Sequence, residues 1–307
     1  MTDDLRLPSW RPGPARDSVI GFLDAAPELP EAERLACFDN DGTLWVERPT
    51  YVQWDFFVDA LTTRSAEDAS LAREPELAAV LGGDRAAIAE LGLVRIAMAL
   101  NGLFASITPE AFTAAAREFM SRAEHPTLGR RHASNTYQPM LELIAELRAL
   151  DFAVTISTGG GAEFVRAVSQ DLYGIPPESV VGTLVQYEYS PDDLGRPRLL
   201  RTRGVFGDAN EGATKVTNIQ TQLGRRPCLA AGNSAGDREM LDWALTGDGP
   251  SLALLLDHDD DEREVAYASE AGTFDAVEPI LEVAERSGWT VVSMRRDWET
   301  VFAPDPA

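Results

Sequence analysis

Lysine, cysteine and histidine are scarce in this sequence, and its hydrophobic runs are short. Of 307 residues, one is lysine, two are cysteine and three are histidine, against 26 arginines. Two cysteines do not indicate a disulfide framework, and because Cys37 and Cys228 each lie in an apolar run, we expect two buried thiols. No apolar run approaches the ~18 residues of a membrane span. The first residues are acidic and form no apolar signal segment, so we expect a cytoplasmic location.

Positive charge is also in deficit. The formal net charge is −23 at pH 7, and the sequence pI is near 4.4. This argues against nucleic acids and anionic membranes as partners, because both bind basic patches. A small phosphate ester remains compatible with it, since one local cation can override the overall field. Hydrophobic residues make up 44% of the chain, which is enough for a packed core.

Apolar segments with strand character alternate with helical ones along most of the chain. Strands are expected at residues 34–38, 152–156, 179–183, 227–231, 251–256 and 290–294, with a small hairpin at 199–203 and 204–207. Such alternation predicts an α/β fold with a doubly wound, mainly parallel sheet. Residues 48–135 show only helical patterns, including a helix start at Thr108 and Pro109. We therefore expect a core of residues 1–46 and 136–307, with an inserted all-helical cap at 47–135.

Polar side chains gather where three of the expected strands end. In doubly wound sheets, ligands bind at the carboxyl ends of the strands, so these polar residues are candidates for one shared site. The three pairs are Asp39 and Asp41, Ser157 and Thr158, and Asn233 and Asp237. The helical insertion directly follows the first pair, so it can cover the site as a lid.

The acids Asp39 and Asp41 are separated only by Asn40. Gly42 follows them and permits a turn. One carboxylate can attack phosphorus and become an aspartyl phosphate. The other, if protonated, can donate to the leaving oxygen and later accept a proton from water. A hard divalent cation would relieve the repulsion between carboxylate and phosphate. The pair favours phosphoryl transfer, with an Asx-type turn that caps the next helix as the structural alternative.

Lys215 is the only lysine of the chain. Because the composition so strongly prefers arginine, a single lysine indicates a chemical need for a compact ammonium group. The alternative is an ordinary solvated residue on a helix.

Residues 39–45, D-N-D-G-T-L-W, resemble the first motif of the haloacid dehalogenase (HAD) superfamily of phosphatases. Over about residues 34–245, the other motifs of that superfamily follow in its order. Several segments also resemble a bacterial phosphoserine-phosphatase-like branch: S-T-G-G-G-A-E-F, Y-G-I-P-P-E, A-G-N-S-A-G-D, H-D-D-D-E-R-E and V-V-S-M-R-R-D-W. The insertion point resembles that of a C1-type cap. This resemblance implies a Mg²⁺-dependent phosphomonoester hydrolase that acts on a small phosphorylated metabolite through an aspartyl phosphate.

The resemblance assigns Asp39 as the nucleophile and Asp41 as the acid and base. Both also match metal positions, and the family uses the backbone carbonyl of the second aspartate for Mg²⁺. Lys215 matches the lone lysine of the family. Asn233 stands where the family usually has aspartate, and its amide oxygen can ligate a hard metal but brings no charge. Asp237, four residues later, is therefore an alternative metal ligand.

On the phosphate side, Thr158 matches the phosphate-binding hydroxyl, with Ser157 as the competitor. The amides of Gly159 and Gly160 are expected to open a helix and to hold phosphate oxygens. Glu47 follows the first motif among aromatic residues, and we interpret it as a substrate-binding residue for a cationic head group. Two alternatives to a phosphatase are a phosphomutase or phosphotransferase of the same superfamily and a catalytically weak protein that binds a phosphate ligand.

Overall fold

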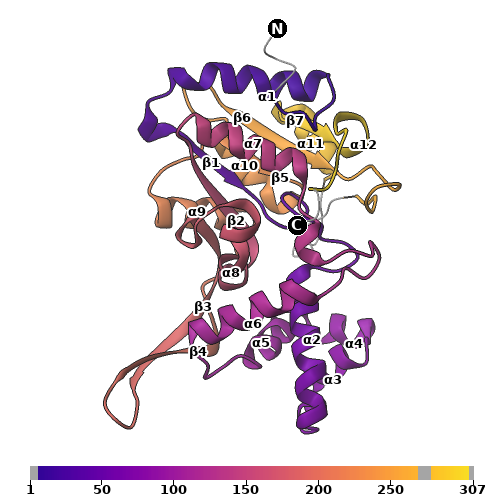
Figure 1. Ribbon diagram of the computed structural model, residues 1–307, viewed down its shortest axis with the longest axis vertical. Helices are drawn as coiled ribbons and strands as arrows, with labels where there is room; N and C mark the ends of the chain where they lie inside the picture. The colour runs from indigo at the N-terminus through magenta and orange to yellow at the C-terminus, as the bar shows by residue number, and fades with distance from the viewer. Residues whose placement is uncertain (1–5, 269–277, 304–307) are drawn as a thin grey trace.

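The computed structural model describes residues 6–268 and 278–303, and a seven-stranded sheet runs through its centre (Figure 1). The strand order is β4-β3-β2-β1-β5-β6-β7, and every neighbouring pair is parallel except β3 with β4. This confirms the expected α/β fold with a mainly parallel sheet. The strands are β1 (Leu35–Phe38), β2 (Ala153–Gly161), β3 (Val180–Pro191), β4 (Pro197–Phe206), β5 (Leu229–Gly232), β6 (Leu252–Asp257) and β7 (Thr290–Ser293).

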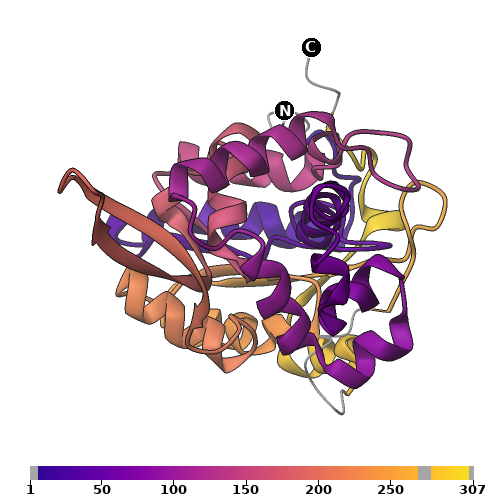
Figure 2. The same cartoon turned by 90° about the horizontal axis from the view of Figure 1, so that it is seen from below.

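Helices cover both faces of this sheet, as the view in Figure 2 shows. Side chains alternate along β1, so Ala36 and Phe38 join the core cluster beneath α1, α7 and α8, whereas Leu35 and Cys37 join the cluster beneath α9, α10 and α11. The helices that cover the sheet are α1 (Pro14–Ala25), α7 (Gln138–Ala149), α8 (Ala162–Tyr173), α9 (Ala213–Leu223), α10 (Arg238–Ala244) and α11 (Ile280–Ser287), and the short helix α12 (Met294–Asp297) follows β7.

The segment between β1 and α7 is helical, as expected, and lies below the sheet in Figure 1. It contains α2 (Val52–Glu67), α3 (Pro75–Leu81), α4 (Arg85–Leu91), α5 (Leu93–Gly102) and α6 (Pro109–Arg122). The predicted start of α6 is confirmed, because the Thr108 hydroxyl accepts a hydrogen bond from the Ala111 amide at 3.2 Å. Phe56 stacks on Phe104 at 4.9 Å within this segment and contacts Phe164 of α8 at 5.2 Å. An aromatic cluster therefore joins the helical segment to the sheet-covering helices.

The hairpin prediction was wrong in extent. Instead of a short strand and a small separate hairpin, β3 and β4 form one long antiparallel ribbon that projects at the lower left of Figure 1. Its turn is closed by Asp192, whose side chain accepts from the amides of Leu194 and Arg196, both at 2.9 Å, and by Gly195 at a φ of 77°. These local turn contacts let both strands continue well beyond the sheet.

One buried arginine ties the ribbon to the helical segment. Arg201 of β4 donates to the Phe104 carbonyl at 3.0 Å and to the Asn101 side chain at 2.7 Å. It also pairs with Glu163, in the first turn of α8, at 2.8 Å. A single side chain thus contacts the ribbon, the helical segment and α8.

Both cysteines are free thiols, as expected, with Cys37 buried and Cys228 partly buried. Among the described residues, no helix is both long and apolar enough to cross a bilayer.

Candidate active site

The three polar strand ends meet at one edge of the sheet. The β1 strand pairs with β2 on one side and with β5 on the other, so the residues that follow these strands lie next to one another. The Asp39 amide continues the pairing by donating to the Ala231 carbonyl at 2.8 Å. Parallel register therefore brings the pair Asp39 and Asp41 next to the pair Asn233 and Asp237, although more than 190 residues separate Asp39 from Asn233 in the sequence.

Asp39, Lys215 and Asp237 form a buried ion triad. The Lys215 ammonium lies 2.6 Å from Oδ1 of Asp39 and 2.5 Å from Oδ1 of Asp237, and its side chain is 1% exposed. Burial raises the pKa of the Asp39 carboxyl well above its usual range; the Asp237 carboxylate adds to this and Lys215 opposes it. Burial alone would lower the pKa of Lys215, but Asp237 and Asp39 together raise it, so the ammonium stays charged.

Asn40, between the two acids, accepts a hydrogen bond from the Tyr173 hydroxyl at 3.1 Å and donates its Nδ2 to Oδ2 of Asp41 at 3.4 Å. The Trp45 indole donates to Oδ1 of Asp41 at 2.9 Å, and the Thr158 hydroxyl donates to Oδ2 at 3.4 Å. Burial raises the pKa of Asp41, and the hydrogen bond from Trp45 opposes the shift. A raised pKa favours the protonated form of Asp41, which is the form that a general acid needs.

The glycine that follows Asp41 adopts a φ of 75°, in the left-handed region. A Cβ atom on Gly42 would lie 2.0 Å from Nδ2 of Asn233, so a larger residue has no room. His258 stabilises this turn, because its Nε2 donates to the Gly42 carbonyl at 2.8 Å. The described residues that follow His258, up to residue 268, form loop and turn.

At the end of β2, Thr158 faces Asp41, and its hydroxyl also accepts from the Gly160 amide at 3.0 Å. The Ser157 hydroxyl instead accepts from the Asn210 side chain at 3.2 Å and is fully buried. The expectation that Gly159 and Gly160 open a helix was wrong. A register shift between Thr158 and Gly161 lets β2 continue through Gly161, and α8 begins only at Ala162.

Asp237 is fully engaged by the protein. Besides its contact with Lys215, it accepts the amides of Asn233 and Ser234 on Oδ2, both at 3.0 Å, as part of a capping box. The Asn233 side chain directs Nδ2 toward Oε1 of Glu47 and the Tyr267 hydroxyl, each at 3.4 Å. Its Oδ1 is therefore the atom that remains available for a ligand.

Glu47 lies beside Asn233, whose Nδ2 is 3.4 Å from its Oε1. Burial raises the pKa of its carboxyl to about 7, with His258 opposing the shift. The nearest cation is Arg48, whose Nε is 3.8 Å from Oε1 and whose guanidinium stacks over the Tyr267 ring at 4.7 Å.

Sequence reasoning missed two residues of the site. A Cβ on Gly159 would lie 1.7 Å from Oε1 of Glu211, and one on Gly236 would lie 2.0 Å from Oε2, so this carboxylate sits between two glycines. Burial raises the pKa of Glu211 to about 7, with Lys215 opposing the shift. Gln53, at the start of α2, accepts the Gly161 amide at 2.8 Å. The only signal for Glu211 was its spacing four residues before the single lysine.

A family model for haloacid dehalogenase-like hydrolases matches residues 36–242, more than half of the chain. The chain belongs to this family. The match covers β1, the helical segment and the strands that carry the polar clusters, so family and geometry concern the same edge of the sheet.

Solved structures share the fold of this HAD-like hydrolase at low identity. A protein of unknown function from Bordetella pertussis Tohama I is 19% identical with a TM-score of 0.52, over 85% of this chain and 98% of that one. A functionally unknown protein from Anaerococcus prevotii DSM 20548 is 14% identical with a TM-score of 0.52, over 80% and 86% of the two chains. A phosphoserine phosphohydrolase-like protein from Francisella tularensis subsp. tularensis SCHU S4 is 17% identical over 82% and 99%, and its TM-score of 0.37 supports no argument. No curated protein matches the chain.

The donors of the HAD-like site fit a hard cation. No three Asp, Glu, His or Cys side chains are grouped as a metal site within residues 6–268 and 278–303. Oxygen donors of other kinds are present, namely the Asn233 amide oxygen and the Asp41 carbonyl beside the Asp39 carboxylate. The bare Cα of Gly42 lets the Asn233 side chain approach the turn that carries the Asp41 carbonyl. An all-oxygen set of this kind suits Mg²⁺.

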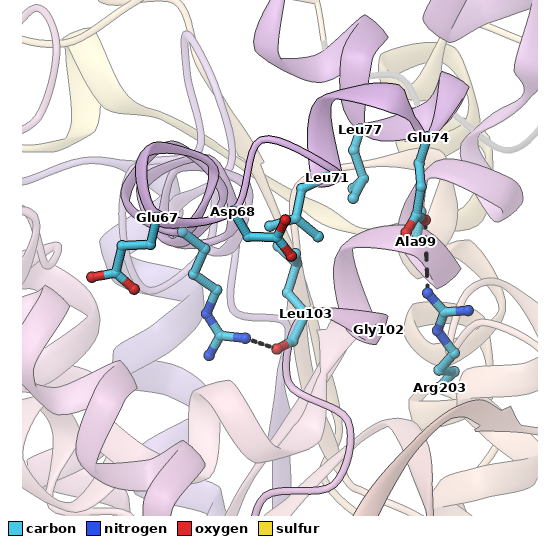
Figure 3. Close-up of a pocket in the computed structure, with 10 residues that line it drawn as sticks. Glu67, Asp68, Leu71, Glu74, Leu77, Ala99, Gly102, Leu103 and Arg203 are labelled. Carbon is cyan, nitrogen blue, oxygen red and sulfur yellow. Dashed lines mark hydrogen bonds and ion pairs between the residues drawn. The ribbon is translucent and has the colours of Figure 1, made fainter.

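A separate pocket of about 390 Å³ lies within the helical segment and against β4 (Figure 3). Arg203 pairs there with Glu74 at 3.7 Å, and Arg64 donates to the Leu103 carbonyl. It contains none of the strand-end residues, so the strand ends remain the candidate site.

Proposed function

We propose that this HAD-like hydrolase is a Mg²⁺-dependent phosphomonoesterase that acts on a small phosphorylated metabolite through an aspartyl phosphate. The observation that carries the proposal is the buried Lys215 ammonium between Asp39 and Asp237, with the Asp41 carboxyl alongside. Lys215 holds Oδ1 of Asp39 and leaves Oδ2 as the attacking atom.

In the first half-reaction, Asp39 Oδ2 attacks phosphorus and the bond to the leaving oxygen breaks. Asp41 in its protonated form, which burial favours by raising its pKa, donates its proton to that oxygen. In the second, a water molecule gives a proton to Asp41 and attacks phosphorus, which frees Asp39 and releases inorganic phosphate. Asp41 is thereby protonated again for the next cycle.

The chain offers separate groups for the phosphoryl oxygens and for the metal. The Thr158 hydroxyl, the Gly159 amide and the Lys215 ammonium face the phosphoryl group, while the Gly160 amide orients the Thr158 hydroxyl. Asp39, the Asp41 carbonyl and Asn233 Oδ1 would hold the metal. Asp237 positions Lys215, because both of its oxygens already have protein donors. A bound Mg²⁺ would supply positive charge that offsets repulsion between carboxylate and phosphate.

We assign residues 47–135 as a C1-type cap on a core of residues 1–46 and 136–307. Gln53 supports this assignment, because it reaches from the first helix of the insertion to the Gly161 amide beside the phosphate side of the site. A cap in that place selects substrates by their leaving group, as in phosphoserine-phosphatase-like enzymes.

The test is the variant Asp39→Asn, which keeps the size of the side chain and removes its nucleophilic charge. Phosphate release from an aryl phosphate in the presence of Mg²⁺ is expected to fall to background, with an unchanged far-UV circular dichroism spectrum. Asp151→Asn is the matched control, because it makes the same change at an exposed residue with a φ of 60°, which asparagine tolerates. Substantial activity in Asp39→Asn would overturn the proposal.

A further inference from the structure

The proposed metal site is short of negative charge. Asn233 contributes a neutral amide, and Asp41 contributes a backbone carbonyl. Asp237 is occupied by Lys215 and by two backbone amides. Asp39 is then the only charged donor, and Lys215 already neutralises part of its charge at 2.6 Å. Carboxylate charge is a main determinant of divalent-cation affinity, so a further anion is to be expected close by.

Glu47 is the carboxylate that adjoins this site. A Cβ on Gly42 would lie 2.7 Å from Cγ of Asn233 and 3.0 Å from Cδ of Glu47, so both side chains border the same space beside the turn. The turn carries the Asp41 carbonyl, which is the next proposed donor. Glu47 therefore lies next to the turn and to Asn233, the two places from which proposed metal donors come.

The Glu47 side chain is also poorly compensated for a buried charge. It is 6% exposed, and besides hydrogen bonds from the Tyr267 hydroxyl and from Asn233 Nδ2, the latter at 3.4 Å, its nearest guanidinium nitrogen is 3.8 Å away. A buried carboxylate is costly unless a cation or strong hydrogen bonds stabilise it. A divalent cation beside Glu47 would provide this stabilisation.

The surrounding side chains hold Asn233 and Glu47 in a fixed orientation. Asn233 donates Nδ2 to Glu47 and to the Tyr267 hydroxyl. Tyr267 stacks on His258 at 4.3 Å, and His258 binds the carbonyl of Gly42. This arrangement keeps the amide nitrogen of Asn233 on the Glu47 side, so its oxygen is left for the cation.

We propose that Glu47 supplies the carboxylate charge that Asn233 lacks, and that it belongs to the metal site, directly or through a bound water, rather than to a pocket for a cationic substrate head. The inference rests on the proposed Mg²⁺ dependence. In this proposal, the negative charge comes from Glu47, in the segment that follows β1, instead of from position 233, directly after β5.

The experiment is calorimetric titration of Mg²⁺ into the metal-free, full-length protein without substrate. Glu47→Gln is expected to weaken Mg²⁺ binding about 10- to 100-fold, the usual effect of losing a group that supports a metal site. The double variant Glu47→Gln/Asn233→Asp restores the lost negative charge at position 233. Its dissociation constant for Mg²⁺ is expected within about threefold of the wild-type value. Asp55→Asn is the control, because it removes a partly buried carboxylate of α2 that contacts Thr50 and His132 instead.

The outcomes separate this inference from the proposed function. If the wild type binds Mg²⁺ and Glu47→Gln binds it equally well, while the KM for a phosphate ester rises, Glu47 is a substrate residue and the inference is wrong. If the double variant stays as weak as Glu47→Gln, charge relocation is wrong. A wild type that hydrolyses esters but binds no Mg²⁺ would overturn the metal dependence and this inference together. Thermal unfolding of each metal-free variant checks the fold, and Glu47→Asp, which keeps the charge, should bind Mg²⁺ more tightly than Glu47→Gln.

Discussion

Replacing Lys215 with arginine tests whether the site needs an ammonium or only a positive charge. An ammonium has three donors, and in this structure two of them point to Asp39 and Asp237 at 2.6 and 2.5 Å. The third is left for an oxygen of the transferring phosphoryl group. The guanidinium of Lys215→Arg keeps the charge but spreads its donors over a broad plane, which cannot meet both carboxylates and the phosphoryl group from the same position.

The size of the effect follows from this geometry. Losing one preorganised, charge-assisted contact to the transition state costs about 2.7–4 kcal/mol in comparable sites, and every 1.36 kcal/mol is a factor of ten in rate. We therefore expect Lys215→Arg to lose at least ~100-fold in kcat. Because the lysine side chain is 1% exposed, the larger group also overpacks its surroundings, at a cost of about 1–3 kcal/mol in the free energy of unfolding.

The assay is steady-state hydrolysis of an aryl phosphate with Mg²⁺, together with the Tm of each protein. Lys215→Met is the companion variant, since it removes the charge and leaves two buried carboxylates without their cation, a loss of about 3–5 kcal/mol in stability. Arginine should therefore retain more stability than methionine while being nearly as inactive. Activity of Lys215→Arg within tenfold of the wild type would refute the reasoning and make the single lysine an accident of composition.

Two further predictions concern the other carboxyl groups. Asp41→Asn should lose about 100-fold or more on alkyl phosphates and much less on nitrophenyl phosphate, whose leaving group needs no proton; its kcat should also lose the decline at high pH, which in the wild type reflects deprotonation of an acid with a raised pKa. Equal losses on both esters would contradict this role. Glu211→Gln should lower the inhibition constant of inorganic phosphate about tenfold at pH 8, or about 1.4 kcal/mol, because it removes a like charge from the phosphate side. The pKa of Glu211 is raised to about 7, so the difference should shrink as the pH falls to 6, where the wild-type group is neutral; a gap that does not change with pH would contradict the charge explanation.

The features that were predicted well from the sequence are those that depend on a local pattern of residues along the chain. The parallel sheet follows from strands and helices that alternate, and the helix start at Thr108 follows from a capping hydroxyl and a proline in the first turn. The meeting of Asp39 with Asn233 follows from the rule that parallel strands end at one edge. None of these predictions needed a contact between specific side chains.

The features that sequence missed depend on tertiary contacts. The extent of β3 and β4 was underestimated, because the antiparallel partner supplies hydrogen bonds that a polar segment such as the one around Glu188 lacks on its own. Glu211 carries no pattern, since only the packing of its loop against Gly159 and Gly236 brings it to the site. The amides of Gly159 and Gly160 do not open the helix that follows, because β3 extends the pairing of β2 past Thr158.

The placement of charge in the site explains why the sequence motif alone was ambiguous. Four carboxyl groups surround one lysine, and the partners of three of them give these three different roles: Asp39 keeps one oxygen free, Asp41 has a pKa raised by burial, and Asp237 holds Lys215. A motif records only which acids are present, whereas the role of each depends on which of its oxygens already has a donor. For the same reason, the neutral amide of Asn233 need not weaken Mg²⁺ binding. The affinity depends on the total charge of the residues around the cation, and we propose that Glu47, which contacts Asn233, supplies the missing charge.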